Sequence, residues 1–176
     1  MTVTPRRPLL RRPLTWTVLA AAVVAAVVAA LVFEPWKLVV DQRVQEAAPA
    51  PTVGAAAGPV VLARGTLISH EHDSSGTVAV LRLPDGSRVL RLENLRTSNG
   101  PALRVWLADA PVRAGTDGWR VFDDGRYVDL GDLKGNIGSA NYPIPTDVDL
   151  ATLPSVSIWC ARFHVSFAAA ALTPAA

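Results

Sequence analysis

The sequence predicts one N-terminal transmembrane helix followed by an all-β domain, an antiparallel β-sandwich of jelly-roll-like type. Two observations carry this prediction. Residues 14–33 form an apolar run without a charged residue, and most of residues 59–172 consists of short runs in which apolar and polar side chains alternate. Such alternation is the pattern of strands with one buried face, and clusters of Gly, Pro, Asn and Asp separate the runs.

The apolar run from Leu14 to Phe33 is long enough to cross a bilayer. About 20 residues at a rise of about 1.5 Å each span a hydrocarbon core of about 30 Å. Four arginines precede the run within residues 1–13, and no comparable basic cluster follows it. By the positive-inside rule, residues 1–13 are a cytoplasmic tail and the rest of the chain lies outside the cytoplasm. We therefore expect a single-pass protein of the cell membrane. A cleaved signal peptide is the alternative, although its apolar region is usually shorter, about 7–15 residues.

The net charge of the chain does not indicate a nucleic-acid partner. The formal charge is +2, of which the four N-terminal arginines contribute +4, so the remainder of the chain carries −2. Because the part expected outside the cytoplasm is slightly acidic and mixed in sign, it lacks the basic surface that binds phosphate backbones.

The segment between the helix and the domain is expected to be a connector. Residues 34–58 comprise a juxtamembrane stretch and then an Ala-, Pro- and Gly-rich stretch from residue 46, which is typical of a mobile spacer. Residues 59–172 are long enough for a single hydrophobic core, and residues 173–176 are expected to be a tail.

Within the domain, residues 77–83 and 89–95 flank the turn sequence P-D-G-S and predict a β-hairpin. Further short runs with strand character are found at residues 103–107, 119–122, 127–130, 155–160 and 163–167. Two stretches rich in Gly, Asn and Pro, residues 97–101 and 130–145, are expected to be structured loops.

Cys160 is the only cysteine in the chain, so it has no disulfide partner within its own molecule. On a strand, Val156, Ile158 and Cys160 share one face, and that apolar face predicts a core position. The alternative is a redox thiol, which requires an electropositive or metal centre nearby and some access.

The three histidines are candidate metal ligands. His70 and His72 stand two apart and would share a face of a strand, and His164 has the same parity as Cys160 if that strand continues. Imidazole and thiolate are the ligand types of copper or zinc sites, so copper is one candidate cofactor. The only methionine is Met1, so an axial thioether is not available to such a site.

Six blocks of the domain, taken in order, resemble a known family. They are G-T-L-I-S-H-E-H-D-S-S-G-T (65–77), V-L-R-L-E-N-L-R-T-S-N-G-P (89–101), L-R-V-W-L (103–107), Y-V-D-L-G-D-L-K-G-N-I-G (127–138), N-Y-P-I-P (141–145) and S-V-S-I-W-C-A-R-F (155–163). The chain is similar to membrane-anchored bacterial members of the electron-transfer DM-thirteen domain family.

The resemblance implies a β-sandwich related to DOMON-type domains and a redox role. The family's cysteine falls on Cys160 and its histidine on His72, whereas His70 and His164 fall outside the family's pattern. In the role that the resemblance implies, the thiol acts by itself or as a ligand to a prosthetic group such as haem. The implied partner is an unidentified redox or cell-envelope protein.

Two other functions remain open. The domain is expected to be an electron-transfer or binding module and not a stand-alone catalyst, because the sequence holds no G-x-S-x-G or H-E-x-x-H motif. A non-enzymatic cell-surface module would bind its partner through the loops at 97–101 and 130–145 and use Cys160 only for packing. A thiol sensor would instead form intermolecular disulfides through Cys160.

Overall fold

The computed structural model describes residues 13–50 and 58–175. The chain divides into two units, one ending at Pro35 and the other beginning at Trp36. The first contains the helix α1 (Pro13–Phe33), which is long and apolar enough to cross a membrane, as membrane anchors and signal sequences both are. A short 3-10 helix, η2 (Pro35–Leu38), follows α1.

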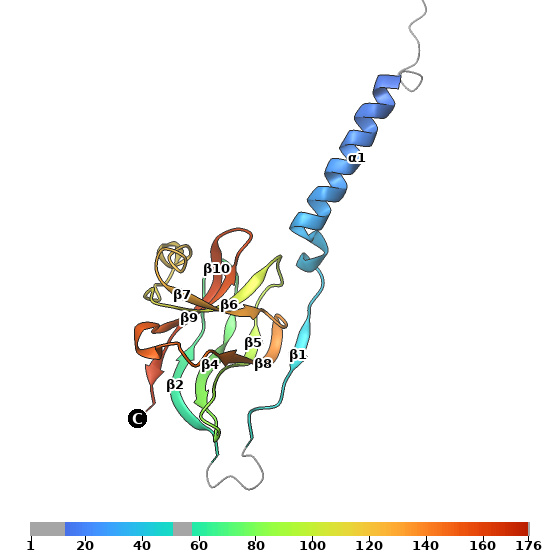
Figure 1. Cartoon of the computed structure of the whole chain (residues 1–176). Coiled ribbons are helices and arrows are strands. Elements are labelled where there is room, and N and C mark those ends of the chain that lie inside the picture. Colours follow the sequence, from blue (N-terminus) through green and yellow to red (C-terminus); the bar gives the residue numbers. More distant parts are fainter. Residues whose placement is uncertain (1–12, 51–57, 176) are drawn as a thin grey trace, which may run out of the picture. The chain divides into compact units, whose positions relative to one another are not determined.

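The second unit consists of two β-sheets (Figure 1). Sheet A has the strand order β1 (Arg43–Gln45), β8 (Ile137–Ile144), β5 (Arg88–Arg96), β4 (Ser75–Arg82), β2 (Val60–Thr66) and β11 (Thr173–Pro174). Sheet B has the order β3 (Ile68–Ser69), β10 (Val165–Ala171), β9 (Ser155–Cys160), β6 (Leu103–Ala108) and β7 (Tyr127–Asp132). Apart from the parallel pair β1–β8, the neighbouring strands are antiparallel. The predicted all-β sandwich after one N-terminal helix is confirmed.

The main hydrophobic core lies between the two sheets and follows the alternation read from the sequence. On β9, Val156, Ile158 and Cys160 all belong to this core, as predicted. Trp159 points to the opposite face, where it forms a second apolar cluster with Trp106 and Phe122. Sheet B is therefore buried on both faces along β9, which explains why none of the residues of that strand is exposed.

The predicted hairpin is confirmed as the pair β4–β5, which keeps one register from Arg82 opposite Arg88 to Thr77 opposite Glu93 and shifts before Ser75. Its turn follows from local chemistry. The carboxylate of Asp85 accepts hydrogen bonds from the backbone N–H and hydroxyl of Ser87, and Gly86 adopts a positive φ of 84°.

The prediction of a loop throughout residues 130–145 is wrong, because β8 occupies residues 137–144 in the interior of sheet A. The glycine and proline that suggested a loop have specific places in this strand. Gly138 has a φ of 118°, and a Cβ atom there would overlap the carbonyl oxygen of Val44 on β1. Pro143 lies beyond the end of β1, whose pairing stops at Ser139, so its missing N–H leaves no ladder hydrogen bond unmade.

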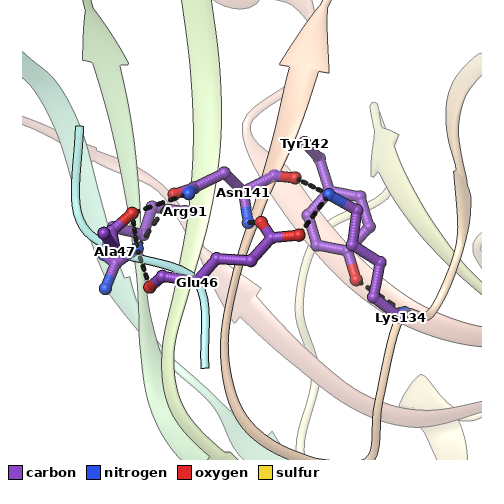
Figure 2. Close-up of polar contacts among 6 residues, drawn as sticks. All are labelled: Glu46, Ala47, Arg91, Lys134, Asn141 and Tyr142. Atoms are coloured by element: carbon purple, nitrogen blue, oxygen red, sulfur yellow. Dashed lines mark hydrogen bonds and ion pairs between the residues drawn. The ribbon is translucent and has the colours of Figure 1, made fainter. Parts of the chain in front are cut away.

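A second difference concerns the segment expected to connect the helix and the domain. Its residues 43–45 form β1, and the next two residues are held by Arg91 of β5, Asn141 of β8 and Lys134 of the segment before β8 (Figure 2). The carboxylate of Glu46 accepts from the Lys134 ammonium at 2.8 Å and from the Asn141 backbone N–H at 2.7 Å. The buried guanidinium of Arg91 donates to the carbonyl oxygens of Glu46 and Ala47 at 3.3 and 3.2 Å. We call β1 with Glu46 and Ala47 the strap.

Two further segments differ from the sequence prediction. Residues 119–122 are not a strand but part of the irregular segment 110–126, which also contains the 3-10 helix η3 (Thr116–Gly118). The expected tail contributes β11, which pairs with β2. The remaining 3-10 helix is η4 (Leu150–Thr152), whose start is capped by the Asp149 side chain.

Candidate functional site

His72 lies in the turn that follows β3, and three contacts fix its position. Its ring packs against Phe167 of β10 with ring centroids 3.9 Å apart, and its Nε2 pairs with the carboxylate of Glu71 at 2.5 Å. The hydroxyl of Ser74 donates to the backbone carbonyl of His72 and also contacts the Thr97 hydroxyl at 2.7 Å. The S-H-E-H-D-S block thus ties this turn to the predicted loop at 97–101.

His72 lines a cavity of about 430 Å³, which we call the His72 pocket. Its walls combine aromatic side chains, two charged groups and the loop that follows β5. They are formed by Glu71, His72, Asn99, Gly100, Pro101, Trp119, Arg120, Phe163, Val165 and Phe167. The indole N–H of Trp119 is buried and has no hydrogen-bond partner among the described residues.

Cys160 lies at the end of β9 on the core face, with 0 % of its surface exposed. It stands opposite Leu103 of β6 and Val165 of β10. Burial raises the pKa of the thiol, and the smaller opposing effects of the backbone N–H groups of Phe163 and Arg162 do not reverse this. The group is therefore a protonated thiol at neutral pH and not a thiolate nucleophile.

The thiol and the His72 pocket are separated by the pocket wall. The Sγ of Cys160 donates to the carbonyl oxygen of Pro101 at 3.2 Å, and Pro101 lines the pocket. Val165, the strand neighbour of Cys160, also lines it, whereas Cys160 itself does not. A group bound in the pocket would thus contact His72 but not the thiol. The two residues as they lie do not fit joint ligation of one haem iron.

His70 does not share a strand face with His72, because β3 ends at Ser69 and both histidines follow it in a turn. The ring of His70 is buried, with Nδ1 2.9 Å from the Ser166 hydroxyl and Nε2 3.0 Å from the carbonyl oxygen of Arg113. Desolvation lowers the pKa of His70. Its contacts hold the irregular segment 110–126 to sheet B, which is a structural role.

His164 does not share the face of Cys160, because β9 ends at Cys160 and residues 161–164 form a turn. Its Nδ1 lies 2.8 Å from the carboxylate of Asp123, and its side chain is 70 % exposed. The structure therefore does not bring the three histidines together with Cys160. Within residues 13–50 and 58–175, no three His, Cys, Asp or Glu residues are grouped as a metal site requires.

The family model for the electron transfer DM13 domain matches residues 66–172. The chain belongs to the electron transfer DM13 family. The match begins at the last residue of β2 and ends directly after β10, so it includes β3 to β10 and the whole His72 pocket. No curated protein and no solved structure shows a significant similarity to the chain.

Sequence patterns identify His72 and Cys160, on either side of the pocket wall, but not most of the residues that form the wall. Phe167 and Phe163 lie in a run that was expected to be a strand throughout, and the strand begins only at Val165. Trp119 lies in a run with strand character but reaches the pocket from an irregular segment. Besides His72, the loop signal at 97–101 points to the pocket, since Asn99, Gly100 and Pro101 line it.

Proposed function

We propose that the DM13 domain is an electron-transfer module that is tethered to the membrane and lies outside the cytoplasm. In this proposal its redox centre is held in the His72 pocket, and Cys160 lies directly behind the pocket wall. The observation that carries the proposal is the hydrogen bond from the Cys160 thiol to the carbonyl of Pro101, because Pro101 is itself a wall of the pocket. Family membership supports the electron-transfer role of the domain as a whole.

The chemistry of the pocket supports a planar, partly apolar redox group. Its volume of about 430 Å³ lies in the range of small-molecule and cofactor sites, about 300–1,000 Å³. Trp119, Phe163 and Phe167 supply aromatic surface to the pocket. His72 supplies the imidazole that would contact the group. When bound, such a group provides a one-electron couple, and the buried thiol modifies its surroundings.

The proposal is tested by titrating the full chain in detergent micelles with ferric haem and recording ultraviolet–visible spectra. We expect a saturable, stoichiometric band in the wild type that His72→Ala loses. His164→Ala is the matched control, because His164 is an exposed histidine outside the pocket, and it should retain the band. Cys160→Ser should also retain a band, since the thiol does not line the pocket. The absence of a saturable band in the folded wild type contradicts the proposal.

The burial of Cys160 also favours a second function, a non-enzymatic cell-surface module that binds a partner protein or a wall polymer. Here the cysteine is a core side chain, in agreement with its place in the main hydrophobic core and its raised pKa. Cys160→Ala would then change stability alone, and neither haem nor another redox group would bind. The same titration therefore separates the two functions.

A further inference from the structure

Three aromatic rings are stacked on the outer face of sheet B, in a line that leads from the interior to the surface. Trp159 of β9 and Trp106 of β6 have ring centroids 5.0 Å apart with 23° between the ring planes. Trp106 and Tyr127 of β7 have centroids 3.9 Å apart and are nearly parallel, at 9°. The exposed fraction rises along the line, from 0 % at Trp159 and 5 % at Trp106 to 44 % at Tyr127.

Packing explains part of this arrangement. Trp159 and Trp106 belong to the second apolar cluster, and Phe122 of the irregular segment covers Trp159. Packing does not explain why two indole N–H groups lack a hydrogen-bond acceptor, because buried tryptophan N–H groups usually find one. The Nε1 atoms of both Trp159 and Trp106 are buried, and neither has a hydrogen-bond partner in the part of the chain that the structure describes.

That the described residues offer no acceptor to these two indole N–H groups affects how an oxidised tryptophan behaves. An oxidised indole is a radical cation that readily loses its N–H proton to a nearby acceptor, and the charge is then trapped on that ring. Where no acceptor is present, the proton stays on the ring and the charge can pass to a stacked neighbour. Tyr127 differs from the tryptophans in that it is exposed, so its phenolic proton can leave to water.

We propose that Trp159, Trp106 and Tyr127 form a one-electron relay across the outer face of sheet B. A one-electron oxidant of the metal-complex class removes an electron from Trp159 and is itself reduced by one electron. Trp106 then supplies an electron to Trp159, and Tyr127 supplies one to Trp106 while releasing its phenolic proton to water. The products are the reduced oxidant, a neutral tyrosyl radical at Tyr127 and one proton in solvent.

The two ends of the relay lie at places that suit its use. Tyr127 lines an open pocket of about 500 Å³ together with Arg126, Asp147 and Asp149, where a small electron donor can reach the phenol. At the other end, Trp159 is the chain neighbour of Cys160, with its ring on the outer face and the thiol on the core face. The relay rests on the proposed function, for which it supplies an electronic route between the surface and the strand end behind the wall of the His72 pocket.

The relay can be tested from His164, because this exposed histidine meets Trp159 edge-on with ring centroids 6.5 Å apart. Its Nδ1 contacts Asp123, so Nε2 is the ring nitrogen presented to an added metal complex. A bis(bipyridyl)ruthenium photosensitiser is attached there on the full chain in detergent micelles, and its position is verified by peptide mapping. A laser flash with hexaammineruthenium(III) as quencher then produces the Ru(III) oxidant beside Trp159.

We expect the optical absorption of a tyrosyl radical to appear in the wild type as the Ru(III) signal decays. Tyr127→Phe should abolish the tyrosyl signal and leave a tryptophan radical, and Trp106→Phe should also abolish it. The matched control is Tyr142→Phe, because Tyr142 is the only other tyrosine and lies in the main core between the sheets. This control should retain the signal.

A tyrosyl signal that is unchanged in Trp106→Phe overturns the relay, as does the absence of that signal in folded wild type that has formed Ru(III). Folding of each variant is verified by circular dichroism. The measurement needs no group in the His72 pocket, so the relay and the proposed function fail separately. A failed relay leaves the haem titration unchanged, and an empty pocket leaves the flash experiment unchanged.

Discussion

At the scale of single residues, the environment of Cys160 decides which thiol chemistry is open to it. Reactive thiols are partly exposed and lie near positive charge, because positive charge stabilises the thiolate and the thiolate is the nucleophile. Cys160 has no exposed surface, and burial raises its pKa. Both facts disfavour a sensor that exchanges disulfides, which needs a thiolate at the surface.

The thiol of Cys160 should therefore react with an aromatic disulfide reagent only as fast as the domain opens. Unfolding in urea should release the reaction, and the measurement is the rate of thiolate release in native and unfolded chain. Cys160→Ala should lower the free energy of unfolding by about 1 kcal/mol, on the scale of one lost buried CH₂-sized group. Rapid reaction of the native thiol would show that Cys160 is accessible.

The buried ring of His70 predicts a loss of stability in acid. Its folded-state pKa is lowered below the ordinary value of 6.5, so the unfolded chain takes up a proton first as the pH falls. The stabilising contribution of neutral His70 is fully present above pH 6.5 and is lost as the pH falls from there through the folded-state pKa. Urea midpoints between about pH 7.5 and about pH 5 should fall less steeply in His70→Gln than in the wild type. Equal slopes would contradict a buried, neutral His70.

At the scale of elements, the outer edge of β8 shows how this sheet limits pairing with another chain. β1 covers the edge as far as Ser139, and the N–H of Asn141 donates to the carboxylate of Glu46. Pro143 has no N–H to offer. An edge without free donors cannot template the addition of a further strand.

Gly138→Ala should detach the strap from sheet A. The new Cβ would overlap the carbonyl oxygen of Val44, and the φ of 118° disfavours any side chain. Gly131→Ala is the matched control, because Gly131 has a similar φ of 116° but open space around its Cβ position. The control should cost about 1–3 kcal/mol for backbone strain alone. Amide hydrogen exchange of residues 43–45 should accelerate in Gly138→Ala and not in Gly131→Ala. Equal protection in both variants would contradict the close packing of β1.

The elements that could be predicted from sequence are those whose pattern is set by local chemistry. The hairpin β4–β5 combines period-two alternation with an Asp-Gly turn, and β9 places Val156, Ile158 and Cys160 on its core face. β8 could not be predicted, because its glycine and proline are explained only by β1, some 90 residues earlier in the chain. The segment 119–122 was misassigned for a related reason, since Phe122 is apolar to cover Trp159 and not because it belongs to a strand.

At the scale of the whole molecule, the site depends on contacts that no local pattern contains. His72 and Cys160 were both identified from sequence, but the wall between them comes from the loop after β5 and the start of β10. Their separation is thus a product of strand pairing across the sandwich. The same pairing places Trp106 of β6 beside Trp159 of β9 and so creates the aromatic stack.

The proposed topology predicts that the DM13 domain is exposed on the outer side of the cytoplasmic membrane. A protease added to spheroplasts should digest the domain while a cytoplasmic marker stays intact, because the proposed orientation keeps the N-terminal arginines in the cytoplasm. Replacing Arg6, Arg7, Arg11 and Arg12 by Gln should lower the digested fraction. A domain that becomes protease-sensitive only after the spheroplasts are lysed would contradict this orientation.

The central claim is that the domain carries electrons through a centre held in the His72 pocket. The most direct test is the difference spectrum between dithionite-reduced and air-oxidised full chain, isolated in detergent from the membranes of the cells that make it. We expect a reversible difference band in the wild type that is lost in His72→Ala and kept in His164→Ala. A folded wild-type chain without any difference band would contradict the claim and favour the binding module.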